Sequence, residues 1–75
     1  MNNTAPVLVF KTTVSSTTEV ERVRPALNAI IAQRGRWNFD LEDRDRILRV
    51  ETPAQVRERV VVLLTGLGFE CDELE

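Results

Sequence analysis

Val14-Ser-Ser-Thr-Thr-Glu-Val-Glu-Arg-Val23 is the stretch where a strand-like run of this chain gives way to a helix-like one. Ser16 and Glu19 have the spacing of a capping box, in which an N-cap hydroxyl accepts a hydrogen bond from the N3 backbone N–H. The N3 carboxylate in turn accepts from the N-cap N–H. Thr18 and Glu21 repeat this spacing two residues later. We therefore expect a helix to begin at Ser16 or Thr18.

The residues on either side of this start predict a strand followed by a helix. The run from Val7 to Phe10 is short, apolar and rich in β-branched and aromatic residues, which is typical of a strand. Apolar residues then recur at helical spacing and predict one buried helix face: Val20, Val23, Leu27, Ile30 and Ile31.

Pro25 complicates the first helix, because a proline in a helix interior removes a hydrogen bond and clashes with the carbonyl four residues back. Either the helix kinks at Pro25, or it begins near Arg24. The apolar register continues back to Val20, so we expect the kink. Gly35 is expected to close this helix.

The next segment predicts a β-hairpin. Residues 37–42 alternate apolar and polar, so that Trp37, Phe39 and Leu41 are expected to face the core. Residues 47–51 are expected to return as the second strand. In that strand Leu48 and Val50 point inward, whereas Ile47, Arg49 and Glu51 point outward.

A second helix and a last strand follow. Thr52 and Gln55 form another capping box, with Pro53 at the first helical position. The expected apolar face comprises Val56, Val60, Leu63 and Leu64, widened by Val61 and Val62. Gly68 is the expected C′ residue, residues 69–72 the last strand, and Asp72, Glu73 and Glu75 part of a solvated tail.

The element order is therefore β-α-β-β-α-β. Two such halves with right-handed crossovers predict an α+β ferredoxin-like sandwich, in which a four-stranded antiparallel sheet carries both helices on one face. We expect a single domain over residues 1–75, with an ordered core of about residues 6–72. The face of the sheet without helices is expected to carry Val7, Val9, Asn38, Asp40, Glu42, Ile47, Arg49, Glu51 and Glu70.

Composition argues against several classes of function. The 75 residues include ten basic and twelve acidic side chains and no histidine, so the chain lacks both a basic nucleic-acid footprint and the commonest general base. The strand at 47–51 also has no aromatic residue of the kind that RNA-recognition domains use to stack bases. No pair of titratable residues suggests catalysis. We therefore expect no enzyme, no cofactor and no nucleic-acid partner.

Localisation is inferred from what the sequence lacks. Cys71 is the only cysteine, which suits a reducing compartment. The first residues do not have the pattern of a signal peptide, and no apolar run is long enough to span a membrane. We expect a cytoplasmic protein without a membrane partner.

At this point the sequence resembles the heavy-metal-associated domain, the copper and zinc carrier module of metallochaperones and metal-transporting ATPases. The resemblance covers chain length, element order, the loop before the first helix, and the Gly68-Phe69-Glu70 exit of the second helix. The family carries Met-x-Cys-x-x-Cys in this loop, and alignment places those residues on Val14, Ser16 and Glu19. The spacing matches, but both thiolate ligands are absent. Hydroxyl and carboxylate oxygens are poor donors for Cu(I).

Few residues remain as candidate ligands. Ser16 and Glu19 are expected to act as a helix cap, with Glu19 the weaker alternative as a metal ligand. Cys71 is expected to be buried, with a role as an intermolecular ligand or redox thiol as the alternative. The acidic residues around the hairpin turn (Asp40, Glu42, Asp43 and Asp45) are expected to be solvated, or else to bind a hard cation weakly. We therefore predict no metal site.

Two functions are compatible with these observations. The first is a non-enzymatic interaction or regulatory module that keeps the metallochaperone scaffold without its ion. Its partner would be another protein, or a second copy, bound through the open face of the sheet. The alternative is a metal-handling protein with unusual ligands: Glu19, the hairpin carboxylates, or Cys71 of a second copy.

Overall fold

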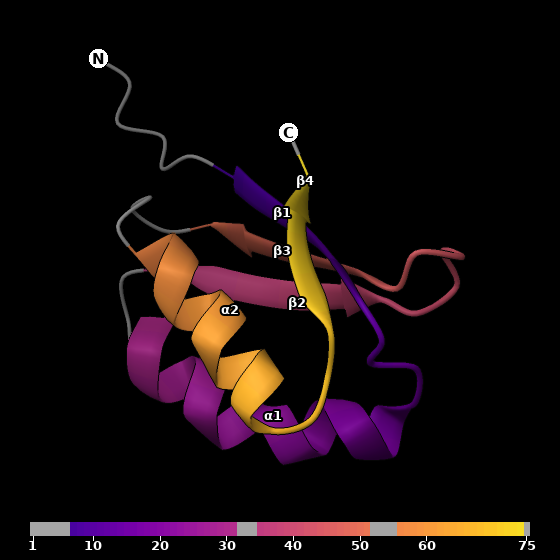
Figure 1. Ribbon diagram of the computed structural model, residues 1–75, viewed down its shortest axis with the longest axis horizontal. Coiled ribbons are helices and arrows are strands. Elements are labelled where there is room, and N and C mark those ends of the chain that lie inside the picture. Colours follow the sequence, from indigo (N-terminus) through magenta and orange to yellow (C-terminus); the bar gives the residue numbers. More distant parts are fainter. Residues whose placement is uncertain (1–6, 32–34, 52–55, 75) are drawn as a thin grey trace.

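The computed structural model describes residues 7–31, 35–51 and 56–74. These residues form six elements in the order β-α-β-β-α-β (Figure 1). The elements are β1 (Val7–Thr12), α1 (Thr17–Ile31), β2 (Arg36–Asp40), β3 (Ile47–Glu51), α2 (Arg57–Gly66) and β4 (Cys71–Leu74).

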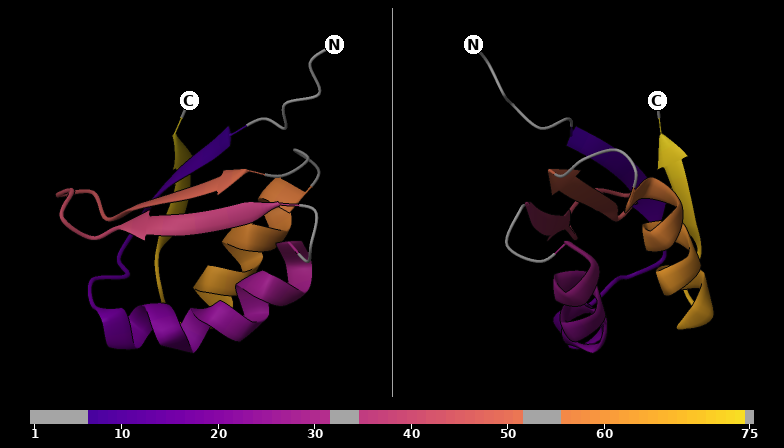
Figure 2. Two further views of the ribbon diagram at one scale, coloured as in Figure 1. Left: turned by 180° about the vertical axis from the view of Figure 1, so that it is seen from behind. Right: turned by 90° about the vertical axis from the view of Figure 1, so that its left-hand side faces the viewer.

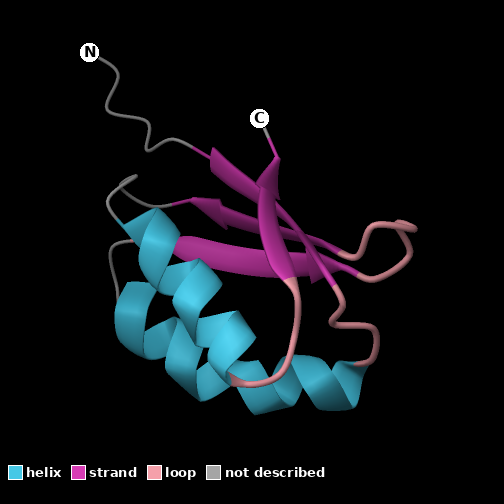
Figure 3. Cartoon of the chain, viewed as in Figure 1, coloured by secondary structure: helices cyan, strands magenta, loops and turns pink. Residues whose placement is uncertain are grey.

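The four strands form one antiparallel sheet in the order β2-β3-β1-β4 (Figure 3). The two central strands, β1 and β3, come from different halves of the chain, and Leu8 lies opposite Val50. Both helices cover the same face, with α1 beneath the β2–β3 side and α2 beneath the β4 side (Figure 2). The α+β ferredoxin-like fold predicted from the sequence is confirmed.

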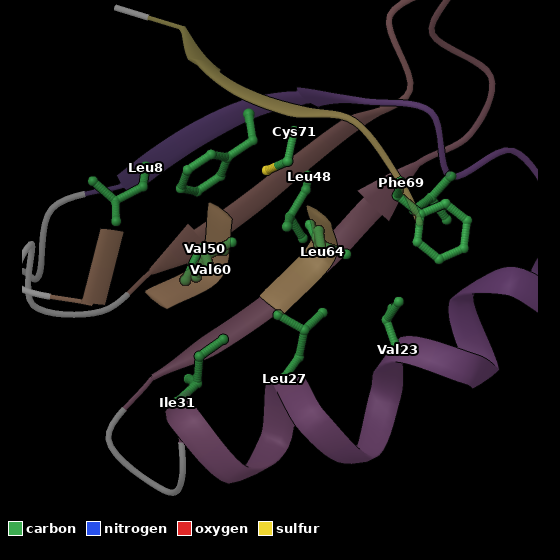
Figure 4. Packing of buried hydrophobic residues seen from close by; sticks show 12 residues of the cluster. Leu8, Val23, Leu27, Ile31, Leu48, Val50, Val60, Leu64, Phe69 and Cys71 are labelled. Atoms are coloured by element: carbon green, nitrogen blue, oxygen red, sulfur yellow. The ribbon is translucent and has the colours of Figure 1, made fainter. Parts of the chain in front are cut away.

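The core lies between the sheet and the helices, and side chains from all layers converge on it (Figure 4). Alternate residues of β1 point inward because successive side chains of a strand face opposite sides. The buried cluster comprises Leu8, Phe10, Val14, Val23, Leu27, Ile31, Leu48, Val50, Val60, Leu64, Phe69 and Cys71. Thr12 is a buried polar residue, and its hydroxyl donates to the carbonyl of Arg46 over 2.7 Å.

Helix α1 runs through Pro25 without interruption, so the alternative start near Arg24 is wrong. The helix axis changes direction between its two halves (Figure 2). The cause is the missing N–H of Pro25, which leaves the carbonyl of Glu21 without its usual partner. The expected end of this helix at Gly35 depends on residues 32–34, which lie outside the described residues, as does the predicted capping box at residues 52–55.

Two strand boundaries differ from the prediction. The strand expected at 37–42 spans Arg36–Asp40, because Leu41 and Glu42 already belong to the turn. The strand expected at 69–72 spans Cys71–Leu74, so Asp72 and Glu73 belong to the sheet and not to a solvated tail. Glu73 is held there by an ion pair with Arg57 of α2 at 3.0 Å.

The exposure of two side chains was also predicted wrongly. Ile47 points to the open face, yet it is only 6% exposed. It sits on a central strand, directly opposite Lys11 on one side and Asp40 on the other, and such flanking side chains shield an apolar neighbour. Val62, expected to widen the buried arc of α2, is 68% exposed, because only the Val60 and Leu64 side of that helix faces the sheet.

Candidate functional site

The loop between β1 and α1 is organised by hydrogen bonds to the helix N-terminus. The backbone N–H of Glu19 donates to Ser16 Oγ over 3.2 Å, and the carbonyl of Ser16 accepts from the N–H of Val20 over 3.0 Å. Because the helix begins at Thr17, Ser16 is the N-cap and the alternative start at Thr18 is wrong.

Glu19 completes this cap, but its carboxylate binds the backbone one residue closer to the N-terminus than in a standard capping box. Its Oε1 accepts from the backbone N–H of Ser15 at 2.8 Å and lies 3.2 Å from the Ser15 hydroxyl. The expected bond to the N–H of Ser16 is thus replaced by a bond to its neighbour. This carboxylate also lies in the first turn, where its negative charge interacts favourably with the positive end of the helix dipole.

All three positions aligned with the heavy-metal motif stabilise the fold, through core packing or through helix capping. Val14 is fully buried in the core cluster. Ser16 Oγ and Glu19 Oε1 both accept hydrogen bonds from the backbone of their own loop. An ion bound by these two oxygens would compete with the bonds that start α1.

Cys71 lies at the beginning of β4, opposite Thr12, with its side chain inside the core (Figure 4). Burial is the main cause that raises the pKa of its thiol to about 12, with a smaller contribution from the charge of Asp72. The thiol is therefore protonated at neutral pH, and a protonated thiol is a poor nucleophile and a poor metal ligand. The structure brings Cys71 near the base of the β1–α1 loop but directs its sulfur away from solvent.

The hairpin carboxylates act within their own turn. Asp40 Oδ1 accepts from the N–H of Glu42 over 3.3 Å, and Asp43 Oδ1 accepts from the N–H of Asp45 over 2.8 Å. Such side-chain bonds to the backbone two residues on are typical of turn-forming aspartates. Within the described ranges 7–31, 35–51 and 56–74, no group of three or more Cys, Asp or Glu residues could hold a metal ion.

A groove of about 510 Å³ runs between α1 and the outer side of β2. Trp37 is one of the residues that line it. The indole Nε1–H donates to Asn28 Oδ1 over 2.9 Å, and the Arg24 guanidinium lies 5.3 Å from the centre of a Trp37 ring. Phe39 meets the indole edge-on at 5.9 Å. Trp37 is half-buried, so the expectation of a core position holds only in part.

Arg24 is itself fixed by Glu21. The guanidinium donates two hydrogen bonds to the carboxylate, over 2.9 and 2.8 Å. These bonds lower the pKa of Glu21 and raise the pKa of Arg24, and in both residues the side-chain hydrogen bond is the largest cause. The sequence analysis did not predict that Arg24 and Asn28 of α1 would hold Trp37. The available signal was the i, i+4 spacing of Arg24 and Asn28, which places both on one side of α1.

The open face of the sheet is the other exposed surface of interest. Its residues are Val7, Val9 and Lys11 from β1, Arg36, Asn38 and Asp40 from β2, Ile47, Arg49 and Glu51 from β3, and Asp72 and Leu74 from β4. Val7 and Leu74 are 52% and 40% exposed, and Leu74 lies opposite Val9. These three residues form an apolar corner, named here the Val7–Leu74 corner. Ile47, expected to join it, is shielded.

The charges on this face largely pair with one another. Arg36 lies 3.6 Å from Glu51, Arg49 lies 3.8 Å from Asp40, and Lys11 lies 3.9 Å from Asp45 of the hairpin turn. All of these pairs are well exposed, so each contributes little to stability. Their effect is that the open face carries no strong field of one sign.

No protein-family model, curated protein or solved structure matches this chain significantly. The structure shows the ferredoxin-like fold, and none of these comparisons supports the resemblance to the heavy-metal-associated domain. Among the described parts of the chain, no helix combines the length and apolar character needed to cross a membrane.

Proposed function

We propose that this chain is a non-enzymatic protein-interaction module with the scaffold of a heavy-metal-associated domain and without that family's ion. The observation that carries the proposal is the Val7–Leu74 corner. Two large apolar side chains are exposed there on the face of the sheet that neither helix covers. An exposed apolar cluster with a polar rim is typical of a protein contact surface.

The charge of the open face favours a protein partner over a polyanion. Its basic side chains are Lys11, Arg36 and Arg49, and its acidic side chains are Asp40, Glu51 and Asp72. These numbers balance, so the surface would not attract nucleic acid or an anionic bilayer by field strength. A protein surface with an apolar centre and mixed charges complements it better.

The chemistry of the β1–α1 loop supports the same proposal. The two oxygens at the family's ligand positions cap α1, and the only thiol is buried with its pKa raised to about 12. A metal carrier would need to give up the helix cap or expose Cys71 before it could bind a soft ion. A metal-handling role is therefore the weaker of the two functions.

The surface is tested by affinity capture with three variants of the full chain. Val7→Asp and Leu74→Asp place a charge in the corner, whereas Val62→Asp places the same charge on an exposed apolar residue of the helical layer. We expect the two corner variants to lose a partner that wild type and Val62→Asp retain. Loss with Val62→Asp alone would locate the contact on the helices and contradict the proposal.

Metal handling is tested separately by amide NMR of the reduced protein. Zn(II), or Cu(I) without oxygen, is titrated into the sample. We expect no saturable shifts in residues 14–20 at micromolar metal. Saturable shifts confined to that loop would restore a metal carrier and remove the proposed function.

A further inference from the structure

We propose that β2 pairs with β2 of a second copy of this chain, which extends the sheet across a two-fold axis at Asn38. Strand β2 lies at the end of the sheet order, and β3 is its one hydrogen-bonded neighbour among the described strands. Both peptide groups of alternate residues in an edge strand point away from the sheet and can accept another strand. This surface is separate from the Val7–Leu74 corner, so the inference does not rest on the proposed function.

The choice of occupant comes from the sequence of the strand, Arg36-Trp-Asn-Phe-Asp40. Antiparallel pairing of two copies about Asn38 places Arg36 of each copy opposite Asp40 of the other. It also places Trp37 opposite Phe39, and Asn38 opposite itself. Directly opposite residues share a face of the sheet, so the ion pairs fall on the open face and the aromatic pairs on the helical side. The side chains of β2 are therefore complementary to those of β2 in a second copy.

The side chains needed for this pairing are available. The Arg36 side chain is 82% exposed. Its ion pair with Glu51, at 3.6 Å, and the pair of Asp40 with Arg49, at 3.8 Å, are both longer than a hydrogen bond. Both charges therefore retain hydrogen-bonding capacity toward a neighbour. Trp37 is held in one orientation by Asn28 and Arg24 before any partner arrives, which reduces the conformational entropy lost on binding.

The opposite edge of the sheet lacks this property. Strand β4 has the sequence Cys71-Asp-Glu-Leu74. A two-fold axis through Asp72 or through Glu73 would bring two carboxylates directly opposite each other, which is destabilising. Glu73 is in addition engaged with Arg57 of α2. Self-pairing is thus favoured at β2 and disfavoured at β4.

The test is charge complementation, measured by sedimentation equilibrium of the full chain. A five-residue edge is short, so we expect a wild-type dissociation constant of about 10 µM to 1 mM. Arg36→Asp places two carboxylates opposite each other across the interface, and Asp40→Arg places two guanidinium groups opposite each other. Each single variant should weaken self-association on the order of tenfold. An equimolar mixture of the two variants should form heterodimers about as stable as the wild-type dimer.

The matched controls are Lys11→Asp and Asp72→Lys, which change the net charge equally but lie on β1 and β4. Neither control should weaken the dimer, and their mixture should show no gain. An amide spectrum of each variant checks that it is folded.

Two results would overturn the inference. In the first, wild type stays monomeric up to about 1 mM. In the second, the dimer survives Arg36→Asp but is lost with Val7→Asp, which would move self-association to the open face and leave the proposed function standing. If the protein stays monomeric and its β2 amides shift when an unrelated extended peptide is added, this edge binds a foreign strand and not a second copy.

Discussion

Ser16 and Glu19 show how a ligand spacing can serve a helix cap. A hydroxyl and a carboxylate three residues apart converge at a helix N-terminus, where they satisfy backbone N–H groups that have no partner within the helix. In this chain the Ser16 hydroxyl accepts a hydrogen bond from the N–H of Glu19, and the Glu19 carboxylate accepts one from the N–H of Ser15. The spacing that would hold a metal ion with two cysteines therefore stabilises α1 instead.

Ser16→Ala should lower the free energy of unfolding by about 0.5–2 kcal/mol, because the N–H of Glu19 loses its acceptor. Urea denaturation followed by circular dichroism measures the change. Thr18→Ala is the matched control, since Thr18 lies inside the helix and alanine favours helix. A larger loss for Thr18→Ala than for Ser16→Ala would show that the cap is wrongly assigned.

Cys71 should make stability depend on pH in the alkaline range. Its pKa is raised to about 12 in the folded protein, whereas an exposed thiol titrates near 8.5. The unfolded chain therefore releases this proton first. The contribution of Cys71 is fully present below about pH 8.5 and is lost as the pH rises toward 12, by up to about 1.4 kcal/mol per unit.

The measurement is the difference in unfolding free energy between wild type and Cys71→Ala from about pH 7 to 11. Other titrating groups largely cancel in this difference. We expect the advantage of wild type to shrink above about pH 8.5. A constant difference over this range would show that the native thiol titrates normally and is accessible to solvent.

At the scale of elements, the exit of α2 is the best-defined helix end. Gly68 has φ of +96°, its N–H donates to the carbonyl of Thr65 over 3.1 Å, and the N–H of Phe69 donates to the carbonyl of Leu64 over 3.0 Å. These bonds are the two of a Schellman motif. They turn the chain back so that Phe69 and Cys71 enter the core, as the choice of Gly68 as C′ residue predicted.

Gly68→Ala should destabilise the protein by about 1–2 kcal/mol, because a Cβ is strained at positive φ. No atom lies within 4 Å of the added Cβ, so the backbone alone accounts for the cost. Gly66→Ala is the matched control: its Cβ also meets nothing, but the residue is helical, and we expect a gain of about 0.4–1 kcal/mol. Thermal unfolding of both variants measures the contrast, and equal effects would contradict the assigned turn.

At the scale of the whole molecule, the two helices leave one face of the sheet uncovered. The radius of gyration is 11.7 Å, and the helical layer lies on one side of the sheet only. A chain of this size buries only about 60% of its unfolded surface. The uncovered face and the two sheet edges are therefore where binding to other molecules is expected, and the two proposals use the face and the β2 edge separately.

Periodicity and turn chemistry in the sequence determined the architecture. Apolar spacing at 20–31 specified a helix face, strict alternation at 37–41 a half-buried strand, and Gly68 a helix end, because these signals depend on local backbone geometry. The cap at Ser16 and the inward direction of Cys71 were predictable for the same reason.

Contacts between distant residues were decided only by the tertiary structure. Whether Ile47 is shielded depends on Lys11 and Asp40, which reach it from two other strands. The groove beside Trp37 depends on how α1 lies against β2. The hydrogen bond that the N–H of Ser15 donates to the Glu19 carboxylate depends on the path of the loop. Local pattern cannot encode such neighbours, because burial of a side chain is set by whatever the rest of the chain places over it.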